Sequence, residues 1–368
     1  MRELLRKNIA NLVPYSCARN DFVGEAEVYL DANENWRDFV GDEGRNRYPD
    51  PLAVQVRKAL DEVLGLPFAG TVIGNGSDEI LDNLFRCFCN PGKDKAIIMS
   101  PTYGAYRVFA DINDVQVEQV PLTPDFAIDF GALETFLLEE KQLRKGQGVS
   151  GKSSGGQEMG RCKLLFICSP NNPTGNAFPL DQIERVCTLF DGITVVDEAY
   201  FDYSPIASAV TLLAKFPRLV VLRTLSKCWS LANARVGIAV ASEELCKVLN
   251  SMKYPYNVGG PSQELALRGL AQADGVKAAL RTTLLEKKRM EEELPLLPCV
   301  VKLFPSDANF LLVRVRQADK LYHYLAQKGI IVRNRSRELH CENCLRITIG
   351  SKSENDKLLE ALSQYKEM

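Results

Sequence analysis

The stretch "TLSKCWSLANARVG", residues 224–237, decides how this chain is interpreted. Apolar runs flank it on both sides, so Lys227 lies in a segment that is typical of buried strand and turn. An ammonium group taken out of water is disfavoured, and a buried lysine therefore tends towards its neutral, nucleophilic form. The alternative is an ordinary lysine whose side chain extends from a strand end to solvent. The rest of the sequence has to decide between the two.

The overall composition is that of a soluble globular protein. The chain has 368 residues, of which 46% are hydrophobic and 25% charged, and its net charge is -2. This balance gives no general affinity for nucleic acid or for an anionic membrane. The first residues, "MRELLRKNIANLVPYS", lack the apolar core of a signal peptide, and no stretch approaches the roughly 18 apolar residues of a membrane span. We therefore expect neither nucleic acid nor a membrane as a partner.

The cysteines and histidines limit the possible chemistry. Eleven cysteines, an odd number, fit reduced thiols in the cytoplasm. Cys341 and Cys344 form one CxxC pair, but a zinc site needs further ligands, and the only histidines are His323 and His340. A turn before a strand is the better interpretation of this pair, and no metal is expected. With two histidines in the chain, a lysine, a carboxylate or a cofactor has to carry any catalysis.

Strand-like and helix-like patterns alternate between about residue 53 and residue 245. The runs "KAIIMS", "KLLFICSP", "ITVVDEA" and "RLVVLRTLS" are short, apolar and bounded by turn residues, as strands covered on both faces should be. "AVQVRKALDEVLG" and "SDEILDNLFRCFC" have helical spacing of apolar residues. The pattern predicts an α/β fold with a mostly parallel, doubly wound sheet. Ligands of such sheets bind at the carboxyl ends of the strands.

The domain organisation follows from changes in these patterns. We predict a large domain over residues 46–261 and a smaller α+β domain over residues 262–368, with residues 1–45 packing on the smaller domain. The C-terminal part alternates helical stretches with the strand-like runs "NFLLVRV", "IIVRN" and "CLRITIG". Residues 144–161 are rich in Gly, Ser and charge, which favours a surface insertion in the large domain over a phosphate-binding loop.

Four predicted loops carry residues that suit a bound cofactor. In "VIGNGSDEILDNLF" a helix begins near Ser77, and helix N-termini bind phosphate. Tyr103 in "SPTYGAY" could stack on a flat ring, and Asn172 in "SPNNPTGNAF" projects an amide from a turn. Asp197 in "VVDEAYFDY" follows a buried strand and needs a cation or a protonated ring nitrogen as partner. Taken singly, these are also ordinary glycine turns, core aromatics and capped strand ends.

Taken together, the loops provide the groups that hold pyridoxal phosphate. Lys227 would form the Schiff base, Asp197 would keep the pyridine nitrogen protonated, and a helix N-terminus with hydroxyls and Arg235 would bind the phosphate. Four separate loops that meet the needs of one cofactor are stronger evidence than any single motif. We therefore expect Lys227 to be catalytic.

From "LVPYSCAR" to "CLRITIG", the order and spacing of these motifs resemble the fold-type I pyridoxal-phosphate enzymes of the class II aminotransferases, and among them the histidinol-phosphate aminotransferases. The resemblance implies a seven-stranded large-domain sheet and a homodimer with shared active sites, in which Tyr48 of "NRYPDP" reaches the partner's cofactor phosphate. It implies that Lys227, Asp197 and Tyr200 are catalytic, with Lys227 also acting as the base of the proton shift. The other implied cofactor contacts are Asn172 beside Tyr200 at the ring oxygen, Tyr103 stacked on the ring, and Ser77, Asp78, Thr224, Ser226 and Arg235 at the phosphate.

The same resemblance implies the substrates. Arg346 matches the arginine that binds the carboxylate of ordinary amino acids, and Arg333 and Tyr15 complete a set that would bind a phosphate ester. Asn33 matches a segment that lies over the pocket, and Asn172 also belongs to the substrate set. The implied reaction moves an amino group between L-histidinol phosphate and 2-oxoglutarate, in histidine biosynthesis. The chain departs from the common family pattern at Cys228, Trp229, Asn233 and Ala234, and in the Gly/Ser-rich insertion.

Several alternatives remain at this stage. A threonine-phosphate decarboxylase on the same scaffold also handles a phosphate ester, and an aromatic aminotransferase would not need Arg333. The fold also occurs as a ligand-sensing module of transcription regulators, but no basic helix-turn-helix region precedes it here. A catalytically inactive homologue is disfavoured because Lys227, Asp197, Asn172 and Arg235 are all present.

Overall fold

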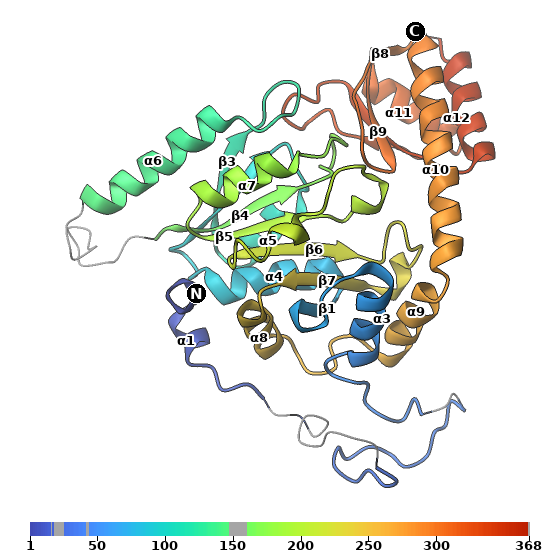
Figure 1. Ribbon diagram of the computed structural model, residues 1–368. Coiled ribbons are helices and arrows are strands. Elements are labelled where there is room, and N and C mark those ends of the chain that lie inside the picture. The colour runs from blue at the N-terminus through green and yellow to red at the C-terminus, as the bar shows by residue number, and fades with distance from the viewer. Residues whose placement is uncertain (16, 18–25, 42–43, 147–159, 367–368) are drawn as a thin grey trace.

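The computed structural model describes residues 1–15, 17, 26–41, 44–146 and 160–366 (Figure 1). Its larger sheet has seven strands: β1 Thr71–Asn75, β2 Lys95–Ser100, β3 Gln116–Pro121, β4 Cys162–Cys168, β5 Ile193–Asp197, β6 Leu219–Thr224 and β7 Val236–Ala241. Their order is β1-β7-β6-β5-β4-β2-β3. Only β7 runs antiparallel to its neighbours β1 and β6, and the other described pairs are parallel. The predicted mostly parallel sheet is confirmed.

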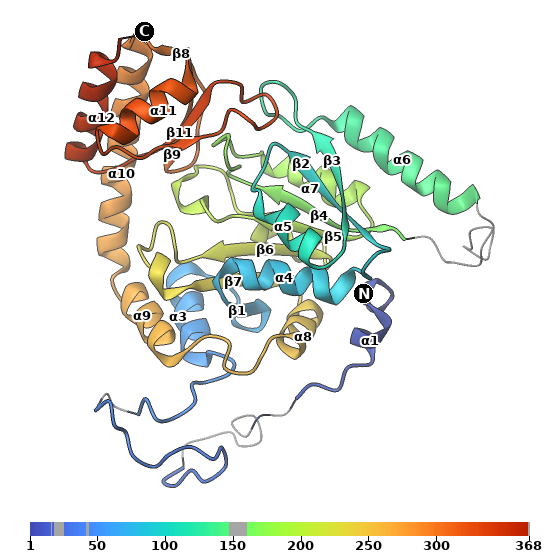
Figure 2. The same ribbon diagram turned by 180° about the vertical axis from the view of Figure 1, so that it is seen from behind.

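Helices cover both faces of this sheet, which explains the continuous apolar runs. The helices concerned are α3 Val54–Leu64, α4 Gly76–Phe88, α5 Ala105–Ile112, α6 Phe130–Gly146, α7 Leu180–Leu189, α8 Glu243–Met252 and α9 Gly260–Leu270. In β4, Leu164 and Phe166 face α4, α5 and α8, whereas Leu165 and Ile167 face α3, α6, α7 and α9 (Figures 1 and 2). Every residue of β4 to β7 is buried as a result.

The strand β3 was not among the strands expected from the sequence. It lies at the edge of the sheet, and its six residues are mostly exposed or half-buried. An edge strand covered on few sides needs no apolar run, so "QVEQVP" lacks the signal that marks the central strands.

A second, smaller sheet lies in the C-terminal part of the chain. Its strands are β8 Val300–Leu303, β9 Phe310–Val315, β10 Arg333–Asn334 and β11 Cys344–Thr348, in the antiparallel order β10-β11-β9-β8. The helices α10 Ala273–Glu293, α11 Ala318–Gln327 and α12 Lys352–Gln364 accompany it (Figure 1). Met290, Leu321, Leu345 and Leu358 belong to its separate core. The turn predicted at the CxxC pair directly precedes β11.

The helix α10 connects the two sheets. Val276 and Leu280 in its first half pack against the core of the large sheet, whereas Met290 belongs to the core of the small one. Ala266 and Leu270 of α9 also belong to the large core. The structure therefore places the start of the small core later than the predicted boundary at residue 262, because α9 still covers the large sheet.

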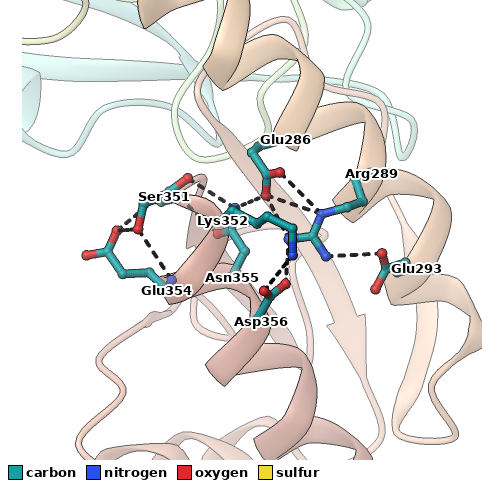
Figure 3. Close-up of polar contacts among 9 residues, drawn as sticks. Glu286, Arg289, Glu293, Ser351, Lys352, Glu354, Asn355 and Asp356 are labelled. Atoms are coloured by element: carbon teal, nitrogen blue, oxygen red, sulfur yellow. Dashed lines mark hydrogen bonds and ion pairs between the residues drawn. The ribbon is translucent and has the colours of Figure 1, made fainter.

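A polar network joins α10 to the start of α12 (Figure 3). Arg289 donates to Glu286 at 2.7 Å and forms an ion pair with Asp356 at 2.9 Å. Asn355 is buried and donates to Glu286 and to the carbonyl of Gly350, both at 3.0 Å, while its side-chain oxygen accepts from the Gly350 N–H. These contacts fix the turn that follows β11, and β11 carries Arg346.

The described N-terminal residues pack on the large domain, contrary to the expected packing on the small one. Leu4 is buried in the core beneath α4 and α8. The Arg6 N–H donates to the Cys87 carbonyl at 3.0 Å, and the Arg6 guanidinium donates to the Arg86 carbonyl at 3.0 Å. The apolar side chain of Leu4 and the unpaired carbonyls at the end of α4 explain this placement.

The remaining elements are short: η1 Arg2–Leu4, α1 Lys7–Ala10, η2 Phe68–Gly70, η3 Phe201–Tyr203, η4 Ala209–Leu212, η5 Ala232–Ala234 and η6 Leu294–Leu296. Within the described residues, no helix combines the length and the apolar character that crossing a bilayer requires.

Most of the predicted insertion at 144–161 lies outside the described residues.

Candidate active site

A pocket of about 510 Å³, including its open mouth, lies at the carboxyl ends of β1, β4, β5 and β6. This is the edge at which ligands of doubly wound sheets bind. Its lining comprises Ser77, Asp78, Tyr103, Cys168, Asn172, Asp197, Ala199, Tyr200, Thr224, Ser226, Lys227 and Arg235. All the cofactor residues implied by the family resemblance are in this set except Tyr48, while Cys168 and Ala199 were not anticipated.

Lys227 follows β6 in a tight turn. The Ser226 N–H donates to the Thr224 hydroxyl at 3.1 Å, and the Ser230 N–H donates to the Lys227 carbonyl at 3.3 Å, which fixes the backbone on both sides of the lysine. The side chain is exposed through the pocket mouth. Partial removal from water, together with the positive charge of Arg346, lowers the pKa of Lys227. The lysine therefore loses its proton more readily than a surface lysine does.

Two other lysines also have a pKa lowered by burial, and they differ from Lys227 in one respect. Lys253 donates to Asn257 at 2.8 Å, and Lys287 donates to the Ser306 carbonyl. For Lys227, the described residues show no hydrogen-bond acceptor, and its Nζ lies 5.5 Å from the ring centroid of Tyr200. An amine without a fixed partner in an open pocket is available as a nucleophile.

Asp197 is the last residue of β5 and is 3% exposed. Its carboxylate accepts from the Tyr106 hydroxyl at 2.8 Å and from the Ala199 N–H at 3.1 Å. Both donors are neutral, and burial raises the pKa of Asp197 to about 6. A buried carboxylate with neutral donors favours a cationic partner in the pocket, such as a protonated ring nitrogen.

Glu198, the neighbour of Asp197, has a different role. It forms an ion pair with Arg223 at 2.7 Å, and it accepts from the Ser208 hydroxyl at 2.8 Å and from the Ala209 N–H at 2.7 Å. Arg223 in turn stacks on Phe201, 3.6 Å from the ring centroid. This cluster joins the loop after β5 to β6, and Glu198 is not among the residues that line the pocket, so Glu198 is a structural carboxylate and Asp197 is the one in the pocket.

The start of α4 forms an anion-binding corner. The first backbone N–H groups of a helix have no partner within the helix, and those at Ser77 and Asp78 lie at the pocket. The corner is closely packed: a Cβ on Gly237 would lie 2.1 Å from the Ser77 nitrogen, and one on Gly76, where φ is +75°, would lie 2.5 Å from the Arg235 guanidinium. Only glycine fits at these two positions.

Arg235 is placed next to this corner. It adopts a left-handed backbone conformation with φ of 53°, and its guanidinium donates to the Asp78 carboxylate at 3.3 Å. The Tyr103 hydroxyl donates to the other oxygen of Asp78 at 3.4 Å. Burial and the charge of Asp78 raise the pKa of Tyr103 to about 12, so its hydroxyl remains a donor at neutral pH.

Asn172 and Tyr200 form another part of the pocket lining. The Asn172 amide donates to the Tyr200 hydroxyl at 3.4 Å, and Arg346 of β11 donates to the Asn172 carbonyl oxygen at 2.6 Å. Burial raises the pKa of Tyr200 and lowers that of Arg346. Arg346 of the small sheet therefore contacts a residue of the pocket, and Arg333 is its register partner on β10.

Besides Arg333 and Arg346 of the small sheet, three of the expected residues are not among those that line the pocket, although the structure describes them. Tyr15 and Asn33 are exposed, and Tyr48 is half-exposed and stacks on Tyr256 at 4.5 Å between ring centroids. All three belong to the chain between α1 and α3, and part of this connection extends away from the sheets (Figure 1). Within one chain, their assignment to the site stays a prediction.

Sequence reasoning missed one residue that contacts a pocket carboxylate. Tyr106 of α5 is fully buried, stacks on Phe166 at 4.9 Å and donates to Asp197. Its sequence signal was weak, since a buried tyrosine needs an acceptor for its hydroxyl but the pattern does not identify that acceptor.

The pocket fits pyridoxal phosphate. The corner at α4 provides N–H groups, hydroxyls and a guanidinium for a phosphate, and the buried carboxylate of Asp197 provides a partner for a ring nitrogen. Tyr103 and Tyr200 present aromatic surface and Lys227 presents an amine in the same pocket. The donor set thus matches the phosphate, the pyridine ring and the aldehyde of the cofactor.

Comparisons with known proteins agree with this arrangement. The family "Aminotransferase class I and II" matches residues 20–362. The histidinol-phosphate aminotransferase of Christiangramia forsetii is 42% identical over 366 residues, which are 99% of this chain and 97% of that protein. Among solved structures, the histidinol-phosphate aminotransferase of Clostridium acetobutylicum has a TM-score of 0.74 at 23% identity, covering 86% of this chain and 90% of its own. The histidinol-phosphate aminotransferase of Sinorhizobium meliloti, solved with pyridoxal-5'-phosphate, has a TM-score of 0.73 at 20% identity. The match covers 86% of this chain and 82% of that one.

Proposed function

The chain belongs to the class I and II aminotransferase family, and we propose that it moves the amino group between L-histidinol phosphate and 2-oxoglutarate, in histidine biosynthesis. The observation that carries the proposal is the contact of Arg346 with Asn172 of the pocket that holds Lys227, with Arg333 as the register partner of Arg346. Two guanidinium groups suit a phosphate dianion better than the single carboxylate of an ordinary amino acid. The similarity to a histidinol-phosphate aminotransferase over nearly the whole chain supports the same substrate.

The cofactor is pyridoxal phosphate, which when bound acts as an electron sink that makes a Cα–H bond of the substrate acidic. The chain's own residues would hold it and move the proton. Lys227 would attach the cofactor through Nζ and then carry the proton between carbon atoms, and its lowered pKa suits both tasks. Asp197 would keep the ring nitrogen protonated, while Tyr200 and Asn172 would hold the ring oxygen. Tyr103 would cover the ring, and Ser77, Asp78, Thr224, Ser226 and Arg235 would hold the phosphate.

Homodimer formation is also part of the proposal. Between residues 12 and 48, the apolar side chains of Val13, Leu30, Trp36 and Phe39 are at least 73% exposed, which is unusual for a segment without a partner. In a dimer this segment would be covered, and Tyr48, Tyr15 and Asn33 would reach the partner's active site. We expect a dimer in sedimentation velocity at micromolar concentration, and Tyr48→Phe should weaken cofactor retention. A fully active monomer would contradict this assembly.

A cytoplasmic location is proposed from the cysteines. All eleven lie in the described residues as thiols outside disulfides, and ten of them are buried. An oxidising compartment would favour pairing of such a set.

Substrate choice can be tested with a panel of amines on the purified holoenzyme. We expect conversion of its absorbance spectrum by histidinol phosphate to be far more efficient than by phenylalanine or threonine phosphate. Arg333→Ala should lower kcat/KM for histidinol phosphate by about 10- to 100-fold, the value of one charged hydrogen bond, and should affect phenylalanine much less.

Other results of this panel would contradict either the role of Arg333 or the proposed substrate. Equal losses on both amines would show that Arg333 does not bind the phosphate. A spectrum that histidinol phosphate leaves unchanged would reject the substrate, and the other two traces would then separate an aromatic aminotransferase from a threonine-phosphate decarboxylase.

A further inference from the structure

The strand pair β10–β11 carries a third arginine beside Arg333 and Arg346. Arg333 is the register partner of Arg346, and the Arg335 N–H donates to the Cys344 carbonyl at 2.8 Å, which continues the ladder by two residues. Side chains of opposite residues, and of residues two apart, lie on the same face of a sheet. Arg333, Arg335 and Arg346 therefore belong to one face.

That face is the one turned towards the large domain and the pocket. The core shared with the large sheet contains three residues of this face, Phe310, Leu312 and Cys344. The small core instead contains residues of the other face, Leu311 and Leu345. The contact of Arg346 with Asn172 is the direct link from this face to the pocket.

The guanidinium of Arg335 has unused hydrogen-bonding capacity. Its Nε is buried and has no hydrogen-bond partner among the described residues. Its one ion pair joins Nη1 to Glu338 at 3.6 Å, longer than a hydrogen bond, and the side chain is 18% exposed. A buried N–H without an acceptor costs free energy, so the site gains when an acceptor enters it.

The neighbouring Arg314 makes a useful contrast. It also lies on this face, as the register partner of Cys344, but it donates to the carbonyls of His340 and Glu342 at 2.8 and 3.1 Å. The Arg314 guanidinium is thus engaged by two carbonyls, whereas among the described residues that of Arg335 has the longer ion pair with Glu338.

The charge of Arg335 acts on Arg346. Burial lowers the pKa of Arg346, and the positive charges of Arg335 and Arg333 lower it further, with Arg335 the larger of the two. Three cations that repel one another on one face favour a multivalent anion among them. A phosphate ester carries nearly two negative charges at neutral pH and offers three acceptor oxygens.

We propose that Arg335 binds the phosphate ester of the amine substrate, as a third guanidinium beside Arg333 and Arg346. This rests on the proposed function and names a further residue of its substrate site. Arg335 then sets the preference for a dianionic amine over a neutral or monoanionic one, because a single carboxylate cannot use three guanidinium groups.

The test compares Arg335→Gln and Arg335→Lys with the control Arg337→Gln, which changes an exposed arginine of the same basic run "RNRSR". Each holoenzyme is assayed with histidinol phosphate and with histidinol, the same amine without the phosphate. We expect R335Q to lower kcat/KM for histidinol phosphate by about 10- to 100-fold, mainly through KM, and to change that for histidinol by less than about threefold. R335K should lie between R335Q and the native protein, and R337Q should stay within about twofold of the native value.

A second readout does not depend on turnover. Inorganic phosphate, titrated into each holoenzyme by calorimetry, should bind R335Q about 10-fold or more weakly than the native protein and R337Q equally well. If the native enzyme converts histidinol phosphate and R335Q matches it in both readouts, Arg335 does not bind the phosphate. Equal losses with histidinol would mean a folding or positioning effect and would also overturn the proposal. If the native enzyme ignores histidinol phosphate, the proposed function fails, and phosphate binding still decides the role of Arg335.

Discussion

Lys227→Ala is expected to abolish transamination, with a loss of at least about 10³-fold in kcat. The structure gives the reason: Nζ lies in the pocket, its pKa is lowered, and the described residues supply no acceptor that would engage it. The variant loses both the covalent attachment of the cofactor and the group that carries the proton, and general acid–base catalysis alone is worth about 10²–10⁴-fold.

Two companion variants make the result specific. Lys227→Arg keeps the positive charge, but a guanidinium does not lose its proton in proteins, so this variant should be as inactive as Lys227→Ala. Lys247→Ala, at an exposed position of α8, should leave kcat within about twofold. The measurements are single-turnover kinetics and the visible absorbance band of the lysine-bound cofactor, which both Lys227 variants should lack. Substantial turnover by Lys227→Ala would remove the lysine from the mechanism.

The parts of the site that lie at strand ends could be predicted from the sequence. Lys227, Asp197 and Asn172 each follow an apolar run, and parallel strands bring such positions to one edge of the sheet. The apolar runs in the sequence were therefore enough to predict that these three residues share one edge of the sheet. The same reasoning failed for β3, because an edge strand has no apolar run.

Contacts between distant elements could not be predicted in this way. Glu198 and Asp197 are adjacent carboxylates in one motif, and only the position of Arg223 on the next strand separates a structural ion pair from a pocket carboxylate. Arg335 was not identified from the sequence, because the burial of its Nε is a property of the folded chain that no local pattern marks. The packing of Leu4 beneath α4 is likewise a tertiary contact without a local signal.

Asp197→Asn is expected to lower kcat by about 10²–10³-fold, the usual effect of removing one preorganised charged or polar group from an active site. The change keeps the shape of the side chain but removes the charge that would pair with the ring nitrogen of the cofactor. Because burial raises the pKa of Asp197 to about 6, the carboxylate is ionised above that pH and takes up a proton below it. Cofactor affinity of the native protein should therefore fall as the pH is lowered through about 6, and this component should be absent in Asp197→Asn.

Tyr106→Phe provides the matching control for that pH dependence. The Tyr106 hydroxyl donates to Asp197 and holds the pKa of the carboxyl down, against the larger effect of burial. Without that donor the pKa should rise further, and the fall in cofactor affinity should begin at a higher pH than in the native protein. The measurement is the dissociation constant of pyridoxal phosphate by fluorescence titration between pH 5 and pH 8 for the three proteins. The cofactor phosphate titrates in the same range, so the comparison among variants is what identifies Asp197. If all three proteins show the same pH dependence, the phosphate alone accounts for it, and Asp197 does not pair with the ring nitrogen.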